Sequence, residues 1–410
     1  MKNWQTVRIF VCSLLLLLIL HWLTTPNEIN QDDIRRFFFP IVWISLTLLL
    51  LKIVQRRYIS YLLFFSVSIT SFLHITKTQN GMFNENPNIW LYGMSFFSLS
   101  LAFLNFQKRG YRVQDIWVFG NPLLVITGPI ITTYRKIGRI NNLRRWHYFG
   151  PYVIIGIFFY KVIAMPLVPY LELKNFPGYL NLLALGIIFE VFVYFNFAGM
   201  SLMIYGLLGI LGLEVPLNFR QPFSSRNLLD FWKGWHTSIS TVLKTMFYQP
   251  LKSRFNSTVA LFVVFVSSAM WHGVTWNFLI WGLLHALSYW MSKILLNSGF
   301  NRIVLLILMV FTLILARIIT IQTDLSRFLL NLNNFEFKEI VIFKNGNLAL
   351  VSLVLGFVII AAEFIFYKHP VFVSRNYKFL RTSKVLFFVV VLTVLFIHNT
   401  SVDYAVYNQR

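Results

Sequence analysis

The chain has 410 residues, of which 57% are hydrophobic and only 12% are charged. A soluble core cannot hide that much apolar surface behind so few charges, so the composition excludes an ordinary soluble enzyme and indicates an integral membrane protein. The apolar residues form continuous runs of helix length rather than the short alternating strands of a membrane barrel. We therefore predict an all-α, polytopic membrane protein, with the lipid bilayer as its first partner.

The net charge of +22 raises the question of nucleic acid binding. Lys and Arg, however, are dispersed in short clusters between apolar segments and form no basic and aromatic stripe on a soluble face. This distribution argues against nucleic acid and is typical of membrane topology, with an acidic cytoplasmic protein as a second candidate partner. The single cysteine, Cys12, lies in the first apolar run, which excludes an intramolecular disulfide and a cysteine metal cluster.

The first apolar run, 7–23, has no small-residue cleavage site at its end, so we expect a retained helix rather than a signal peptide. Further apolar runs of spanning length follow at about 38–54, 58–76, 90–106, 151–171, 179–197, 200–213, 258–275, 276–296, 303–319, 348–366 and 385–398. The run 117–131 is broken by Gly120, Pro122, Gly128 and Pro129, which predicts a re-entrant or interrupted helix.

Basic clusters orient these helices, because Lys and Arg are enriched in cytoplasmic loops. This rule places Arg56, Arg57 and the clusters within 135–147 and 368–384 in the cytoplasm. The N-terminus is then cytoplasmic and the C-terminus extracytoplasmic, which requires an odd number of crossings. We predict about 11 transmembrane helices, together with re-entrant and interfacial helices. No repeat and no linker divides the chain, so we expect a single membrane domain, 1–410.

Two histidines, His236 and His272, are each flanked by tryptophan and each border a long apolar run. An ionisable side chain at membrane depth is costly unless it is partnered or used. Histidine is also a suitable general base near neutral pH, and such a base contributes roughly 10²–10⁴-fold to a rate. Both are therefore candidate catalytic residues. The structural alternatives are that His272 is hydrogen-bonded to a neighbouring helix and that His236 caps an interfacial helix.

Apolar residues near His236 recur at helical spacing and predict one amphipathic helix at the membrane interface; they are Leu228, Phe231, Trp232, Trp235 and Ile239. For His285, which lies 13 residues beyond His272, we expect a packing role. No Gly-x-Ser-x-Gly elbow and no His-Glu-x-x-His motif occurs, and the acidic residues are too few for a carboxylate cage. No metal site is predicted.

The residues around both histidines resemble the signatures of one known family. The stretch 230–240 reads Asp-Phe-Trp-Lys-Gly-Trp-His-Thr-Ser-Ile-Ser, and Trp271-His272-Gly273 is followed by Trp276 and by Trp-Gly-Leu-Leu-His at 281–285. Both are similar to motifs of the membrane-bound O-acyltransferase (MBOAT) family, especially the bacterial branch that includes alginate O-acetylation proteins and the teichoic-acid D-alanyl transferase. Weaker matches at 93–98, 127–130, 194–201 and 216–223 extend the resemblance over about 90–290, with 1–89 and 291–410 as peripheral helices.

The resemblance implies a bowl of tilted helices with a central channel, where a donor and an acceptor meet from opposite sides. It implies that His272 is the catalytic residue and that His236 lies across the channel and assists it. The residues expected to line the channel or to contact substrate are Trp232, Trp235, Trp271, Trp276, Asn196 and Asn218. Three of the matched positions depart from the family pattern, which usually has Asp in place of Asn196, commonly has Tyr in place of Met200 and often has Arg in place of Gly234.

The implied reaction moves an acyl group, acetyl or D-alanyl, from a cytoplasmic thioester to a hydroxyl of an extracytoplasmic cell-envelope polysaccharide or related acceptor. It needs no bound cofactor, because the donor substrate is an acyl-coenzyme A or an acyl carrier protein thioester. Arg135, Arg139, Arg144 and Arg145 suit the phosphates of coenzyme A or an acidic carrier protein, and a role as topological anchors is the alternative.

The resemblance also implies the bacterial cytoplasmic (inner) membrane as the location. It leaves open two routes to the polymer, direct transfer by this protein or completion of the transfer by an extracytoplasmic partner acyltransferase. The alternative function is a polytopic transporter or flippase of a lipid-linked glycan. A transporter is expected to line its helices with charged residues, and it does not need two histidine motifs. The two motifs therefore favour the acyltransferase.

Overall fold

The computed structural model of the chain describes residues 4–24, 60–65, 89–107, 112–127, 129–138, 142–171, 179–321, 347–365, 389–391 and 393–394. Almost all of them are helical, apart from one sheet of two short strands. In these ranges, five helices are long and apolar enough to cross a membrane: Leu143–Leu171, Leu180–Leu211, Trp276–Asn297, Arg302–Thr320 and Leu348–Ile365. Three shorter apolar helices accompany them: Gln5–Leu15, Phe96–Phe106 and Ser257–His272. The chain is a multi-pass membrane protein.

The number of about 11 crossings stays a prediction, because the expected spans 38–54, 58–76 and 385–398 lie wholly or largely outside the described residues. The orientation of the termini also stays a prediction, since Arg56, Arg57 and the cluster 368–384 lie outside them too. The chain divides into two compact units. One comprises Met1–Gly150, Ile204–Pro216 and Tyr404–Arg410, and the other comprises Pro151–Met203 and Leu217–Asp403. A single membrane domain over 1–410 likewise stays a prediction.

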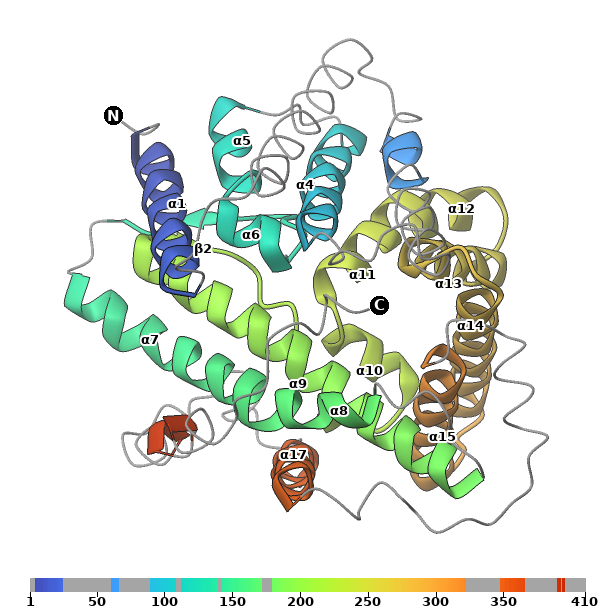
Figure 1. Cartoon of the computed structure of the whole chain (residues 1–410). Coiled ribbons are helices and arrows are strands. Elements are labelled where there is room, and N and C mark those ends of the chain that lie inside the picture. The colour runs from blue at the N-terminus through green and yellow to red at the C-terminus, as the bar shows by residue number, and fades with distance from the viewer. Residues whose placement is uncertain are drawn as a thin grey trace, which may run out of the picture. The chain divides into compact units, whose positions relative to one another are not determined.

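In the first unit, four helices pack together: α1 (Trp4–Thr24), α4 (Ile89–Phe106), α5 (Val113–Phe119) and α6 (Pro122–Thr127) (Figure 1). The break between α5 and α6 confirms the interrupted helix predicted from Gly120 and Pro122. Asn121 stabilises this break, because its side-chain oxygen accepts the backbone N–H of Leu123 at 3.1 Å and its amide nitrogen donates to the Ser13 hydroxyl at 3.0 Å.

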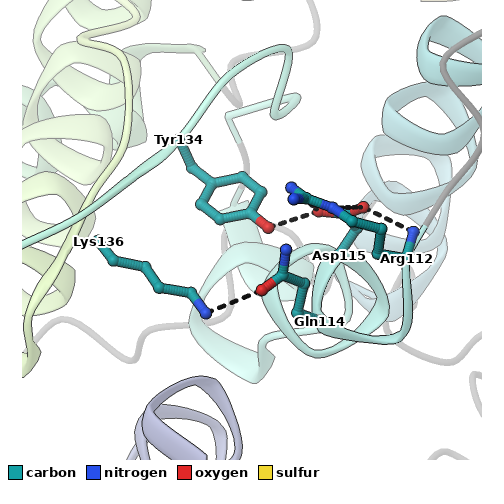
Figure 2. Close-up of polar contacts among 5 residues, drawn as sticks. All are labelled: Arg112, Gln114, Asp115, Tyr134 and Lys136. Carbon is teal, nitrogen blue, oxygen red and sulfur yellow. Dashed lines mark hydrogen bonds and ion pairs between the residues drawn. The ribbon is translucent and has the colours of Figure 1, made fainter. Parts of the chain in front are cut away.

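The segment 129–138 of the first unit is held against α5 by a cluster of polar side chains (Figure 2). The Tyr134 hydroxyl donates to the buried Asp115 carboxylate, which also accepts the Arg112 backbone N–H at 2.7 Å. Burial and the bond to Asp115 raise the pKa of Tyr134, so this tyrosine remains a hydrogen-bond donor. Lys136 donates to Gln114 at 2.9 Å. Beyond Tyr134, strand β1 (Arg135–Lys136) pairs antiparallel with β2 (Leu213–Glu214).

Two long helices contribute residues to both units. The first begins as α7 (Asn142–Phe158) and continues through η1 (Phe159–Ala164), η2 (Met165–Leu167) and α8 (Val168–Leu171). The second is α9 (Tyr179–Leu211), a single helix of 33 residues. The prediction of two separate spans at 179–197 and 200–213 is therefore wrong. Nothing between them ends the helix, because Gly199 serves as a contact point for another helix rather than as a helix terminus.

The contact between α7 and α9 in the second unit depends on two glycines. A Cβ atom on Gly156 would lie 2.6 Å from the Gly199 carbonyl oxygen and 2.7 Å from the Met203 backbone nitrogen. A Cβ atom on Gly199 would lie 2.8 Å from the Gly156 carbonyl oxygen. Backbone atoms cannot move aside as a flexible side chain can, so the two helices approach this closely only where both positions are glycine.

We expect Gly156→Ala to destabilise the protein by about 1–3 kcal/mol, because the added methyl group forces the packed backbones apart. The change should appear as a lower midpoint of thermal unfolding for the purified protein in detergent. Gly138→Ala is the matched control, since a Cβ atom there meets nothing within 4 Å. An equal midpoint for both variants would contradict the close-packing argument.

The rest of the second unit follows α9 in the chain. It consists of η3 (Pro222–Ser224), α10 (Leu228–Gly234), α11 (Thr237–Leu243), η4 (Lys244–Tyr248), α12 (Gln249–Arg254), α13 (Ser257–His272), α14 (Trp276–Asn297), α15 (Arg302–Thr320) and α17 (Asn347–Ile365). Helix α14 packs between α13 and α15, and α10 packs on α14 (Figure 1). Side-chain N-caps define the starts of α13, α14 and α15. Asn256, Thr275 and Asn301 each accept a backbone N–H of the first turn.

Candidate active site

His236 lies at a break between two short helices. Helix α10 ends at Gly234, Trp235 is extended, and α11 begins at Thr237. His236 itself has φ 43° and ψ 55°, the left-handed conformation that residues other than glycine rarely adopt. The single amphipathic helix predicted across 228–239 is therefore wrong, although the apolar positions at its ends are buried as expected. Backbone strain of this kind persists only where the surroundings impose it, and it is frequent at functional sites.

The segment 217–220 imposes the break. The Thr237 backbone N–H donates to the Asn218 carbonyl at 2.8 Å, and the Thr237 hydroxyl donates to the Leu217 carbonyl at 2.7 Å. On the other side of His236, the Arg220 N–H donates to the Gly234 carbonyl at 2.9 Å. A Cβ atom on Gly234 would lie 2.9 Å from the Arg220 carbonyl oxygen, so the close approach of this segment requires glycine at 234.

The hydrogen bonds around Ser238 also define which nitrogen of His236 carries its proton. Asn218 Oδ1 accepts the Ser238 backbone N–H at 3.2 Å and the Ser238 hydroxyl at 2.9 Å. The only hydroxyl hydrogen is thus used, so Ser238 Oγ can act only as an acceptor for His236 Nδ1, which lies 3.4 Å away. Nδ1 then carries the hydrogen, and Nε2 is left as the basic nitrogen. Sequence reasoning did not select Ser238, although it lies within the first histidine motif.

His272 is the last residue of α13, where Gly273 ends the helix with its N–H bonded to the Ala269 carbonyl at 3.0 Å. Its imidazole is exposed and contacts three aromatic rings. The Phe278 ring stacks on it at 5.8 Å, and the rings of Trp271 and Trp281 lie edge-on at 4.8 and 5.3 Å. An exposed ring held by aromatic neighbours is oriented and remains accessible to a reactant.

Trp271 joins the two histidines. Its ring lies 5.7 Å from the His236 ring and 4.8 Å from the His272 ring, edge-on to both. The two imidazoles are therefore no further apart than the sum of these distances, although one lies between α10 and α11, the other at the end of α13, and 35 residues separate them in the chain. The structure brings His236, His272 and Trp271 together.

The other residues expected to line the site are placed in different surroundings. Trp235 is buried against Phe219 at 5.1 Å and Phe231 at 5.3 Å, and Asn218 is the buried brace described above. Trp276 is 69% exposed at the start of α14. Asn196 is 2% exposed on α9, and its side-chain oxygen has no hydrogen-bond partner among the described residues. None of the described contacts joins Asn196 or Trp276 to either histidine.

Trp232 and His285 contact the Trp281 ring, which His272 also contacts. The Trp281 ring is 5.3 Å from the His272 ring and 4.7 Å from the His285 ring, and the Trp232 ring is 5.1 Å from His285. His285 is buried, as a packing role predicts, but it lies only one aromatic ring away from the proposed catalytic residue. Trp281 was not selected as a site residue from the sequence, although it belongs to the second motif.

An ion pair between two membrane-spanning helices contacts Trp235, the residue that precedes His236. Arg317 of α15 donates through Nε to Glu190 of α9, and their side chains are 15% and 9% exposed. The guanidinium carbon of Arg317 also lies 5.4 Å from the centre of the Trp235 ring, within the range of a cation–π contact. This pair was not identified from the sequence, because its partners are 127 residues apart.

The basic residues proposed for donor binding belong to the first unit, apart from Arg139, which lies outside the described residues. Arg135 is exposed and paired with Glu214, the residue opposite it in the small sheet. Arg145 is buried, and its Nη2 donates to the Gly138 carbonyl at 2.8 Å. Arg144 is exposed near the start of α7. Arg135 and Arg145 thus have structural contacts of their own.

Burial lowers the pKa of His236 to about 4 from its usual 6.5. Above pH 6.5 the imidazole is neutral in both the folded and the unfolded chain. As the pH falls from 6.5 towards 4, the unfolded chain takes up the proton before the folded chain does, so the free energy of unfolding decreases. We expect the midpoint of thermal unfolding to fall between pH 6.5 and 4.5, and to fall less in His236→Asn, which tolerates the left-handed backbone and does not titrate.

The control for this measurement is His147→Asn, which removes an exposed histidine from α7. Its midpoint is expected to follow the wild-type curve across the same pH series. If the unfolding midpoints of His236→Asn and the wild-type chain declined in parallel with falling pH, the titration of His236 would make no contribution to the pH dependence of stability.

Comparison with known proteins supports the resemblance seen at these motifs. The model of MBOAT, the membrane-bound O-acyltransferase family, matches residues 57–298, which is more than half of the chain. A peptidoglycan O-acetyltransferase of Helicobacter pylori is 37% identical over 100 residues, 23% of this chain and 19% of that protein. A probable alginate O-acetylase of Pseudomonas putida is 36% identical over 99 residues, 23% of this chain and 20% of that protein.

A teichoic acid D-alanyltransferase of Bacillus subtilis is 29% identical over 155 residues, 34% of this chain and 39% of that protein. The chain thus spans well under half the length of each of these curated relatives. The family match covers both histidine motifs and the helices that position them. The chain belongs to the membrane-bound O-acyltransferase family.

Proposed function

We propose that this protein is an O-acyltransferase that moves an acyl group, acetyl or D-alanyl, from a cytoplasmic thioester donor to a hydroxyl of an extracytoplasmic cell-envelope polysaccharide. The observation that carries the proposal is the pair of imidazoles that both contact Trp271, one exposed on α13 and one held at a strained break between α10 and α11. The family to which the chain belongs, and relatives named for O-acetyl and D-alanyl transfer, support this class of reaction.

The two imidazoles suit a direct transfer that uses no covalent enzyme intermediate. The exposed imidazole of His272 takes the proton of the acceptor hydroxyl while the oxygen attacks the thioester carbonyl. The new C–O bond forms, the C–S bond breaks, and the imidazolium returns the proton to the departing thiolate. His236, whose ring also contacts Trp271, keeps a lone pair on Nε2, so it can accept a hydrogen bond from the sugar and orient the attacking hydroxyl.

The donor, the location and the partner belong to the same proposal. The donor is a thioester of coenzyme A or of an acyl carrier protein, and the basic residues suited to its phosphates or acidic surface are Arg135, Arg139, Arg144 and Arg145. The protein acts in the bacterial cytoplasmic membrane with its N-terminus in the cytoplasm. The proposed transfer to the polymer is direct, and a relay through an extracytoplasmic partner acyltransferase is the alternative route.

A transporter or flippase is less consistent with the described residues. Within the membrane-spanning helices, Glu190 is paired with Arg317, and Glu363 accepts the Tyr194 hydroxyl at 2.5 Å. These buried carboxylates therefore take part in contacts between helices, whereas a transport pathway needs charged groups that face a passage.

The proposed function is tested by mass spectrometry of acyl groups released by mild alkali from the envelopes of cells with and without the gene. We expect one ester-linked acyl species to be absent from cells that lack it, and its mass will identify the group transferred. An identical set of released species in both cell types, with the protein shown to be expressed, would overturn the transferase assignment.

A further inference from the structure

Glu363 is a buried acidic residue near the end of α17 that the proposed reaction does not use. It is 2% exposed, and its Oε1 accepts the hydroxyl of Tyr194, a fully buried residue of α9, at 2.5 Å. Ionisable side chains are seldom buried in a membrane-spanning helix, and those that are usually have a function. Helix α17 lies beyond residues 57–298, the part of the chain that the family model matches. The family match therefore does not explain Glu363.

The end of α17 also contacts the segment 223–226. Helix α17 packs on η3, and the Phe223 backbone lies next to the Glu363 carboxyl group. Nη2 of Arg226 donates to the Phe364 carbonyl at 2.9 Å, and its guanidinium carbon lies 3.4 Å from the centre of the Phe364 ring. Carbonyl groups in the last turn of a helix lack partners within that helix, so an arginine bound there stabilises the contact. Two consecutive residues of α17 thus restrain this segment.

The restrained segment is continuous with the one that imposes the break at His236. Residues 217–220 bond to the backbone on both sides of His236, as described above, and only two residues separate them from Phe223. One of these two, Gln221, has φ 48°, and it shares with His236 the left-handed backbone that residues other than glycine rarely adopt. Such strain persists only where the surroundings impose it. The hydrogen bonds beside His236 fix one end of this loop, and the end of α17 fixes the other.

Tyr194 extends the restraint through aromatic contacts. Its ring lies 4.9 Å from the Phe223 ring and 6.0 Å from the Trp235 ring. The Phe219 ring lies 5.1 Å from the Trp235 ring and 5.9 Å from the His236 ring. The hydrogen bond from the tyrosine hydroxyl to α17 therefore restrains a group of rings that packs against His236.

We infer that Glu363 is a positioning residue for His236. Through Tyr194 and Phe223 it holds the segment 217–224 in the conformation that imposes the left-handed backbone on His236. It acts on the imidazole through these residues and needs no contact with a substrate. The inference rests on the proposed function, in which His236 orients the attacking hydroxyl. Helix α17 then contributes to the active site, although it follows the matched part of the chain.

Hydrogen–deuterium exchange of the full-length protein in detergent measures the restraint without any substrate. We expect Glu363→Leu, which removes the acceptor, to raise the exchange rate of peptides that cover 217–240 roughly tenfold. Glu363→Gln keeps an oxygen that can accept the Tyr194 hydroxyl, so its exchange should stay close to that of the wild type. Ser352→Ala is the matched control, because Ser352 is a buried residue of α17 whose hydroxyl donates at 2.7 Å to a carbonyl of η1 instead of contacting η3.

The initial rate of transfer to isolated cell envelopes measures the consequence for catalysis, with acetyl-coenzyme A and the D-alanyl thioester of an acyl carrier protein as donors. We expect Glu363→Leu to lower kcat roughly 10–100-fold, the effect of a displaced active-site group, with little change in KM for the donor. Tyr194→Phe, which loses only the hydroxyl, should lower kcat similarly, and Ser352→Ala should not. In a chain that carries His236→Asn, Glu363→Leu should lower kcat little further, because both changes remove the same contribution.

The outcomes separate the restraint from the proposed function. Wild-type exchange rates in Glu363→Leu, or in Tyr194→Phe if the leucine variant does not fold, would overturn the inference. An equal loss of kcat from Glu363→Leu in the wild-type and the His236→Asn chains would show a general structural role, and would overturn the positioning of His236. Transfer from neither donor by the wild-type protein would overturn the proposed function, and the exchange rates would still decide whether Glu363 restrains 217–240.

Discussion

Replacement of His272 by alanine is expected to lower the rate of acyl transfer by roughly 10²–10⁴-fold, because the reaction then lacks the group that takes the proton of the attacking hydroxyl. His272 is exposed at the end of α13, and among the described residues its imidazole contacts the aromatic rings of Trp271, Phe278 and Trp281. Its removal therefore leaves no buried polar atom unpaired. The measurement is the initial rate of transfer by the purified variant, together with the amount of alkali-released acyl group in the envelopes of cells that carry it.

Two further variants separate catalysis from structure. His272→Gln keeps a polar side chain of similar length but cannot take up a proton, so we expect it to be as inactive as the alanine variant. His147→Ala removes an exposed histidine from α7 and is expected to transfer at the wild-type rate. Transfer by His272→Gln at more than about a tenth of the wild-type rate would assign His272 a structural role and leave His236 as the candidate base.

Arg317→Leu is expected to have the largest effect on stability, about 3–5 kcal/mol, because it leaves the Glu190 carboxylate buried without a partner. The Glu190 side chain is 9% exposed, and Arg317 is the residue that pairs with it. The substitution also removes the cation–π contact with Trp235, the residue that precedes His236. Thermal unfolding in detergent measures the first effect, and the rate of transfer measures the second.

The double variant Arg317→Leu/Glu190→Leu tests whether the stranded charge is the cause. Removing both partners of a buried ion pair is often neutral, so most of the lost stability should return. The surface pair of Lys233 and Asp230, at 2.7 Å with the lysine 74% exposed, is the control, and Lys233→Leu should cost under about 1 kcal/mol. If the single and double variants were equally unstable, lost packing rather than the unpaired carboxylate would be responsible.

The sequence predicted well those helices whose ends carry a local signal. The expected spans 276–296 and 303–319 agree with α14 and α15 to within one residue at each end. Apolar runs of spanning length bounded by Thr275 and Asn301, which cap the first turns, make these boundaries visible in the chain itself. Helix α13 ends three residues earlier than expected, at His272, because Gly273 terminates it.

The sequence misled where a residue acts through a partner far away in the chain. From the local sequence, Gly199 was expected to end a helix. Instead α9 continues through it, and the missing side chain allows close contact with Gly156, 43 positions earlier. The apolar spacing of 228–239 predicts one helix. The Asn218 carbonyl, however, accepts the Thr237 N–H, and the Arg220 N–H donates to the Gly234 carbonyl, so the chain breaks at Trp235 and His236. Helical periodicity records which positions are buried, and it does not record where the backbone is interrupted.

The sequence by itself determined the class of the molecule, the family resemblance and the two histidines, because composition and short motifs are properties of neighbouring residues. Only the tertiary structure decided that Trp271 joins the two imidazoles, that Ser238 and Asn218 set the tautomer of His236, and that Arg317 and Glu190 pair near Trp235. Each of these facts depends on a contact between residues that lie 20 or more positions apart in the chain. Such contacts depend on how the helices pack, which no local pattern along the chain encodes.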